Sequence, residues 1–251
     1  MIVAVQASPE QQASLLELQQ HDTSLMQLAH KRSSVPEIET VKVHEATLAA
    51  LDLKIVAIKT EISDLSLAQK KAENDVEQVV ERAKRDQERI DSSASTNAKE
   101  LEVLQHEIES LAKRRAELED VELEIMLQLE SAREAQSELL KEQEDIATQL
   151  AEAVATRDAA FAEIDQQISA VTDERNTVAK SVDAQLLALY DKIRIDSGGI
   201  GAALLHRGAC QGCHIALDAT EVDRIRHLDA DVVVRCEECR RILVRTSESG
   251  L

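Results

Sequence analysis

The chain has very few aromatic residues. Its 251 residues include no Trp, one Phe and one Tyr, together with six Gly and two Pro. A globular core of this length normally contains more aromatic side chains, and its connections need more Gly and Pro. The composition therefore argues against an ordinary compact globule.

The residues that dominate instead are Ala, Glu, Leu, Gln, Lys and Arg. This composition is typical of long helices and coiled coils. We therefore expect a mainly α protein in which most of the chain forms a helical rod.

The N-terminal stretch MIVAVQAS is short and has no basic flank. It predicts neither a signal peptide nor a membrane span. We therefore expect a cytoplasmic protein without a membrane partner. Cysteines stay reduced in that compartment, and clustered cysteines there favour metal binding over disulfides.

The negative charge is concentrated in the first four fifths of the chain. The formal net charge is -19, and residues 1–199 hold 22 Lys and Arg against 40 Asp and Glu. Residues 200–251 hold 7 basic and 8 acidic residues. An acidic rod repels nucleic acid phosphates. The same charges are also what the solvated flanks of a coiled coil would carry.

The start and the first interruption of the rod can be read from capping residues. Ser8 and Pro9 suit the N-cap and the first helical position, and Gln11 would complete a capping box. A kink or break is expected near residues 33–36, because Pro36 lacks a backbone donor and disfavours helical geometry at Val35.

Apolar residues recur with heptad spacing beyond that break. From Leu48 to Ile90, alternate steps of three and four residues reach apolar side chains at 11 of 13 positions. A second track runs from Leu104 to Ala160 in steps of seven and, after a slip of one residue, continues to Leu189. Both tracks predict coiled-coil helices.

The two tracks are separated by DSSASTN at residues 91–97, which predicts a turn followed by an N-cap at Asn97. An antiparallel hairpin is the simplest arrangement, and folding about residue 94 would bring Pro36 opposite about residue 152. The alternative is a dimer of extended helices. We expect the helix to end near residues 196–197, with Gly198 as its stop. The predicted domains are a helical hairpin over 1–197 and a small β domain over 198–251.

All four cysteines lie in that C-terminal domain, as two CxxC pairs. Cys210 and Cys213 are separated by 22 residues from Cys236 and Cys239. Four thiolates match the tetrahedral coordination of zinc and leave no open position for catalysis. We expect one structural zinc ion per chain, which a segment with so small a core needs in order to fold.

Other features of this domain point to ordinary roles. We expect His206, His214 and His227 to be polar surface residues, and the glycine-rich stretch at residues 198–201 to be a flexible joint. The expected strand material is at residues 232–234 and 242–244. No catalytic motif is present in the sequence. An enzyme and a small-molecule substrate are therefore not expected.

Four stretches of the sequence are distinctive: NAKELEVLQHEIESL followed by LED, LYDKIR at 189–194, GACQGCHIAL at 208–217 and VVVRCEECRRILV at 232–244. With them the chain resembles a bacterial family of C4-type zinc ribbon proteins with an N-terminal coiled-coil hairpin. The resemblance covers essentially the whole chain. It implies a long kinked hairpin with a ribbon at the helix ends and a zinc ion held by the four cysteines. It also implies nucleic acid binding or adaptor activity, and some members act through protein partners and RNA.

The sequence departs from that family after the last cysteine. Family members commonly have Gly there, where the backbone is left-handed, and this chain has Arg240. Arg can adopt that conformation at a cost of about 1 kcal/mol. The fold is expected to survive, and the ribbon gains a positive charge.

Two functional hypotheses follow. In the first, the protein is a non-enzymatic adaptor whose ribbon binds RNA, DNA or protein, with Arg235, Arg240, Arg241 and Arg245 as the candidate nucleic acid contacts. The ribbon lacks aromatic side chains for base stacking. The arginines could equally solvate the ribbon and pair with acids such as Glu237 and Glu238. In the second hypothesis, the acidic coiled coil is a scaffold for partner proteins, without nucleic acid binding.

Overall fold

The structure is a computed structural model that describes residues 5–92 and 98–251. Within these residues the chain is mainly helical and ends in a small β region, which confirms the expected fold class. None of the described helices is both long and apolar enough to cross a membrane. The elements are α1 Pro9–Ser33, α2 Glu37–Ser92, α3 Ala98–Ser181, α4 Ala184–Asp196, β1 Ala202–His206, β2 Ala209–Cys210, α5 Ala219–Arg226, β3 Val234–Arg235 and β4 Ile242–Val244.

The chain divides into two compact units. Unit 1 combines Met1–Ile38 with Ala155–Leu251, and unit 2 is Glu39–Val154. The boundary predicted between residues 197 and 198 therefore falls inside unit 1. The N-terminal helix, the C-terminal part of α3 and the ribbon belong to one packing unit.

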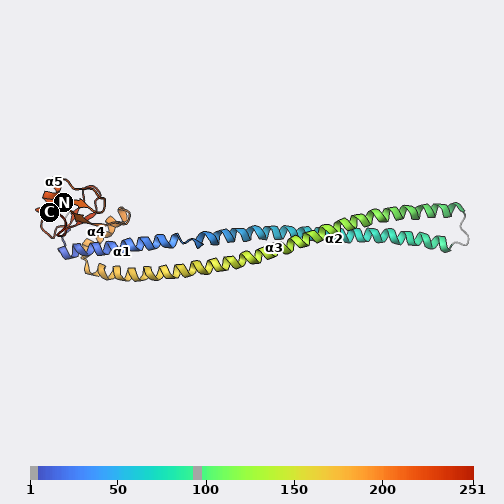
Figure 1. Ribbon diagram of the computed structural model, residues 1–251, viewed down its shortest axis with the longest axis horizontal. Coiled ribbons are helices and arrows are strands. Elements are labelled where there is room, and N and C mark those ends of the chain that lie inside the picture. Colours follow the sequence, from blue (N-terminus) through green and yellow to red (C-terminus); the bar gives the residue numbers. More distant parts are fainter. Residues whose placement is uncertain (1–4, 93–97) are drawn as a thin grey trace. The chain divides into compact units, whose positions relative to one another are not determined.

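Unit 2 is an antiparallel hairpin in which α2 and the first part of α3 run side by side (Figure 1). Arg82 and Glu107 form an ion pair across it at 2.6 Å. All thirteen positions of the first heptad track are buried or half-buried, which explains why the two helices pair. The hairpin expected within one chain is confirmed. Residues 93–97 of the predicted turn, with the proposed cap Asn97, lie outside the described residues.

The predicted start of α1 and the predicted break after it are both present. The Ser8 hydroxyl accepts a hydrogen bond from the Gln11 amide at 3.3 Å, and α1 ends at Ser33 while α2 begins at Glu37. The expected partner of the break was wrong, since Pro36 lines a hollow with Ala160 and Ile164, further along α3 than residue 152. The shift is already present within the continuous helices: folding about residue 94 would place Asp52 opposite about residue 136, but the Gln143 side chain donates a hydrogen bond to the Asp52 carboxylate.

The helical part of the chain has a second break, which the sequence analysis missed. The expected continuous helix up to residue 196 is instead divided between Ser181 and Ala184. The Asp183 carboxylate accepts hydrogen bonds from the amides of Gln185 and Leu186, at 2.8 and 3.2 Å, and so starts α4 as an N-cap. The last residue of α4 is Asp196, where the helix was expected to end.

The ribbon contains a four-stranded sheet with the order β2-β1-β4-β3. The parallel pair β1 and β4 forms its centre, with Ala203 opposite Leu243, and β2 and β3 pair antiparallel at its edges. The strand predicted at residues 242–244 is present as β4, whereas of the predicted stretch 232–234 only Val234 lies in β3. The sequence analysis missed β1, β2 and α5. In the case of β1 the reason is that this strand directly follows the glycine-rich stretch that we expected to be a flexible joint.

Each face of the sheet belongs to a different hydrophobic cluster. On one side Ile242 and Val244 pack with Leu15, Leu186 and Tyr190 of the helices. The other side holds an apolar cluster with Cys210, Cys236 and neighbouring side chains of the ribbon. The ribbon is therefore attached to α1 and α4 through a shared core.

The N-terminal segment reinforces this attachment. Residues 5–7 lie along residues 231–233, where the Val233 amide donates to the Val5 carbonyl and the Ala7 amide donates to the Asp231 carbonyl. These backbone bonds extend the edge of the ribbon with residues from the far end of the sequence.

Candidate metal centre

The four cysteines come together at one point of the ribbon. Their Sγ atoms all lie within 4.8 Å of one another, with Cys210 and Cys239 at 3.8 Å and Cys213 and Cys236 at 3.9 Å. Four sulfurs around a zinc ion at ~2.3 Å stand about 3.8 Å apart, so the donor set fits tetrahedral zinc.

The two CxxC turns have the same backbone geometry. The amide of His214 donates to the Cys210 carbonyl at 2.8 Å, and the amide of Arg240 donates to the Cys236 carbonyl at 2.9 Å. Both residues after the second cysteine are left-handed, with φ of 61° at His214 and 64° at Arg240. The left-handed conformation expected of Arg240 is therefore present, and it recurs at His214.

In the metal-free protein the pKa shifts of the cysteine thiols differ in direction. Burial raises the pKa of Cys210 to about 12 and also raises the pKa of Cys236. At Cys239 burial also acts to raise the pKa, but hydrogen bonds from the Arg241 amide and neighbouring thiols outweigh it and lower the pKa. Zinc binding therefore has to displace protons, above all at Cys210. With four protein ligands, the centre is closed to substrate and water.

The three nearby histidines are not part of the cysteine cluster. His206 lies 3.6 Å from the Glu248 carboxylate, and the ring of His227 contacts the Asp223 carbonyl at 2.8 Å. His214 is exposed at the surface of its turn.

Two of the four arginines predicted to contact nucleic acid instead donate hydrogen bonds to backbone carbonyls. The Arg241 guanidinium donates to the carbonyls of Ser197, Ile200 and Gly212. That of Arg245 donates to four carbonyls between residues 228 and 232, and burial lowers the pKa of its side chain. Both side chains satisfy backbone groups of the ribbon and the segments that border it.

The other two arginines, Arg235 and Arg240, are exposed and adjacent. The Arg235 Nε atom donates to the Arg240 carbonyl at 2.9 Å. This single bond orients Arg235 and leaves its remaining donors available. The structure thus brings together a pair of surface arginines rather than the expected cluster of four.

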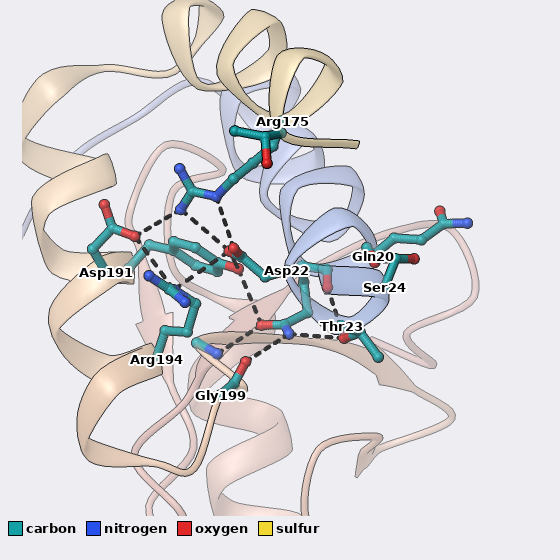
Figure 2. Close-up of polar contacts among 12 residues, drawn as sticks. Gln20, Asp22, Thr23, Ser24, Arg175, Asp191, Arg194 and Gly199 are labelled. Carbon is teal, nitrogen blue, oxygen red and sulfur yellow. Dashed lines mark hydrogen bonds and ion pairs between the residues drawn. The ribbon is translucent and has the colours of Figure 1, made fainter. Parts of the chain in front are cut away.

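A buried polar cluster that the sequence analysis missed lies where α1, α3 and α4 meet the ribbon. Asp22 is 3% exposed and accepts from the Tyr190 hydroxyl at 2.6 Å and from Arg175 Nε at 2.7 Å. Figure 2 shows Arg175 and Arg194 converging on Asp22 and Asp191. The hydrogen bond and the charge of Asp22 raise the pKa of Arg175. One available signal was Tyr190, the single Tyr of the chain.

The glycine-rich stretch at residues 198–201 lies at this junction between the helices and the ribbon and is held there by hydrogen bonds and close packing. Gln19 accepts from the Gly201 amide at 2.7 Å and donates to the Gly199 carbonyl at 3.0 Å. A Cβ atom at Gly201 would lie 2.7 Å from the Tyr190 carbonyl oxygen, so close packing requires glycine there. The expected flexible joint is instead bonded to α1 and α4.

Comparison with protein families gives two matches. Residues 18–198 match the CT398-like coiled coil hairpin domain, and residues 209–243 match the C4-type zinc ribbon domain. The second match contains all four cysteines. Together with the sulfur geometry, it identifies the centre as a site for one structural zinc ion.

Relatives span nearly the whole chain. An uncharacterised protein of Mycobacterium tuberculosis strain H37Rv is 33% identical over 241 residues, covering 96% of this chain and 98% of that protein. A solved structure from Mycobacterium smegmatis has a TM-score of 0.82 and 34% identity, and covers 96% of this chain and 100% of its own. The structure of CT398 from Chlamydia trachomatis has a TM-score of 0.70 at 18% identity, with 93% and 97% covered, and shares the fold.

Proposed function

The chain belongs to the family of CT398-like coiled-coil hairpin proteins with a C4-type zinc ribbon, and we propose that it is a non-catalytic adaptor that binds partner proteins. Zinc stabilises the ribbon, and the hairpin supplies the surface to which partners bind. The closed four-cysteine site supports this proposal because a zinc ion with four protein ligands has no position at which to activate water.

The observation that carries the proposal is the exposure of large apolar side chains on the flanks of the hairpin. Such side chains add nothing to the seam between α2 and α3. Where they lie together, as Leu123, Met126 and Leu127 do, an exposed apolar surface favours protein contacts. Those more than two fifths exposed in unit 2 are Val43, Leu53, Val56, Leu67, Val103, Val121, Leu123, Met126, Leu127 and Leu140.

Affinity capture tests the adaptor proposal. Tagged, zinc-loaded full-length protein is incubated with extract of cells that express it naturally, with and without nuclease, at near-physiological salt. We expect at least one protein to be retained in near-stoichiometric amount in both samples. Recovery of no protein above the level of an unrelated acidic coiled coil would contradict the proposal.

Nucleic acid binding by the ribbon is a second candidate, favoured by the exposed pair Arg235 and Arg240. If it occurs, a variant with both residues changed to Gln should bind RNA or DNA at least about tenfold more weakly and with a shallower salt dependence. Arg226→Gln is the matched control, because Arg226 is also exposed but lies 3.5 Å from the Asp223 carboxylate. Arg241 is unsuitable for this test, since replacing it also removes three hydrogen bonds to backbone carbonyls.

A further inference from the structure

A groove of about 670 Å³ runs along α3 in unit 2, bordered on the α2 side by Gln69. Its walls include Leu123, Met126 and Leu127, and its floor includes Leu129. Lining residues recur in steps of three and four from residue 123 to residue 137, which places them on one face of α3. At ~1.5 Å per residue this face extends over about 21 Å, the length of four helical turns.

The apolar walls are open to solvent. Leu123, Met126 and Leu127 are 56%, 45% and 58% exposed, whereas Leu129 is 3% exposed. The floor thus belongs to the packed seam, while the three wall residues lie outside it. A Leu and Met surface of this kind suits an apolar helix face, because Met adapts its shape to different side chains.

The charge around the groove restricts the kind of partner. Residues 117–137 of α3 contain seven acidic residues and one basic residue, Arg133. Residues 60–75 of α2 contain four acidic and two basic residues. Glu130 and Glu134, which line the groove, are exposed. A second copy of this chain would place like charges against one another, so charge complementarity favours a basic occupant.

We propose that this groove binds an amphipathic helix of a partner protein that carries Lys and Arg beside an apolar stripe. Apolar side chains of that helix, spaced by three and four residues, contact Leu123, Met126 and Leu127. Its basic side chains pair with Glu130 and Glu134. The inference rests on the proposed adaptor function and names the surface and the chemistry of the partner.

Two synthetic peptides test the groove directly. Both carry the same heptad stripe of Leu, and the other positions are mainly Lys in one peptide and mainly Glu in the other. Fluorescence anisotropy with zinc-loaded full-length protein should show binding of the Lys peptide and none of the Glu peptide. The double variant Leu123→Ser with Leu127→Ser should bind the Lys peptide about tenfold more weakly or worse, because apolar burial is lost at constant protein charge.

Leu67→Ser is the matched control, since Leu67 is an exposed apolar residue of α2 in the same unit that does not line the groove. It should leave the affinity for the Lys peptide unchanged. Helical circular dichroism should be the same for all variants, because every replaced side chain is exposed. Equal affinity of the wild type and the double variant would overturn the proposal, as binding would then depend on charge alone.

Three further outcomes test the occupant of the groove and distinguish this inference from the adaptor function. A concentration-dependent dimer in sedimentation, abolished by the double variant, would assign the groove to a second copy and overturn the proposal. If captured partners bind the double variant as well as the wild type, the adaptor function is supported and the proposal that partners bind in the groove is overturned. If the Lys peptide binds in the groove but no protein is captured, the groove is supported as a site for a basic helix and the adaptor function is contradicted.

Discussion

At the scale of single residues, the zinc centre is defined by side-chain chemistry and by local backbone geometry. The cysteine pairs supply the donor atoms, and the left-handed residues His214 and Arg240 close the two turns around them. The contacts of single side chains also divide the four arginines of the ribbon into two groups. Arg241 and Arg245 bind backbone carbonyls, while Arg235 and Arg240 remain at the surface.

Replacing Arg240 with Gly should stabilise the zinc-bound ribbon slightly. Glycine adopts the left-handed conformation without the steric cost of a side chain, so we expect a gain of up to about 1 kcal/mol in the free energy of unfolding. The measurement is thermal unfolding at saturating zinc, with Arg240→Val as the opposite control. A large loss of stability in Arg240→Gly would show that the arginine side chain itself supports the ribbon.

Zinc affinity should rise with pH through the neutral range. Without metal, burial raises the pKa of Cys210 to about 12, so its thiol keeps its proton and zinc must displace it. Acidification therefore favours protons over zinc, and alkalinisation favours zinc. Competition with a chelator of known, pH-corrected affinity, at about pH 6 and about pH 8, measures this. An affinity independent of pH would mean that the thiols are already ionised in the metal-free protein.

At the scale of the elements, a few polar side chains determine where helices end and how they join the ribbon. The N-cap Asp183 starts α4 after the break, and Asp22 links α1 to α3 and α4 through Arg175 and Tyr190. Because Asp22 is buried, its hydrogen bonds form in a medium of low polarity and depend on every partner being present.

Replacing Asp22 with Ala should destabilise unit 1 strongly. The change leaves the Arg175 guanidinium and the Tyr190 hydroxyl without their shared acceptor, and removing one partner of a buried pair costs about 3 kcal/mol. Urea unfolding followed by circular dichroism measures the loss.

Glu174→Gln is the control, since Glu174 is 65% exposed where it lies 3.6 Å from His21, and its replacement should change stability by less than about 0.5 kcal/mol. Equal effects of the two substitutions would show that the Asp22 cluster contributes no more than a surface ion pair.

At the scale of the whole molecule, the zinc ribbon is not an independent appendage of the helices. Ile242 and Val244 share a core with Leu15 and Tyr190, and the N-terminal segment is bonded to residues 231–233. The sequence analysis assigned the need for zinc to the small domain over residues 198–251 alone. The shared core indicates a wider effect.

Chelation of zinc should loosen α1 and α4 together with the ribbon. Loss of the sheet exposes the apolar faces that these helices bury against it, while the seam of unit 2 keeps its own contacts. Hydrogen exchange with and without chelator should show faster exchange over residues 9–33, 184–196 and 202–244. Exchange over residues 39–92 and 98–154 should stay unchanged. Faster exchange confined to residues after 200 would contradict the role of the shared core.

The sequence by itself determined the repetitive and the short-range features of this protein. Heptad spacing specifies the helices and their buried faces, because helical periodicity depends only on neighbours a few residues apart. Ser8 and Pro9 specify the start of α1, and Pro36 the break before α2. The two CxxC pairs specify zinc, because four thiolates suit that ion in particular.

Only the tertiary structure decided the features that depend on residues far apart in the chain. Asp22 and Arg175 are 153 residues apart, and no local pattern distinguishes them from the many other charged residues on the same helices. Likewise β1 becomes a central strand only because β4 is available as its parallel partner. The guanidinium of Arg241 donates to backbone carbonyls, whereas Arg240 lies exposed at the surface. The two arginines are neighbours in sequence, and the difference arises because the fold determines which carbonyls each guanidinium can reach.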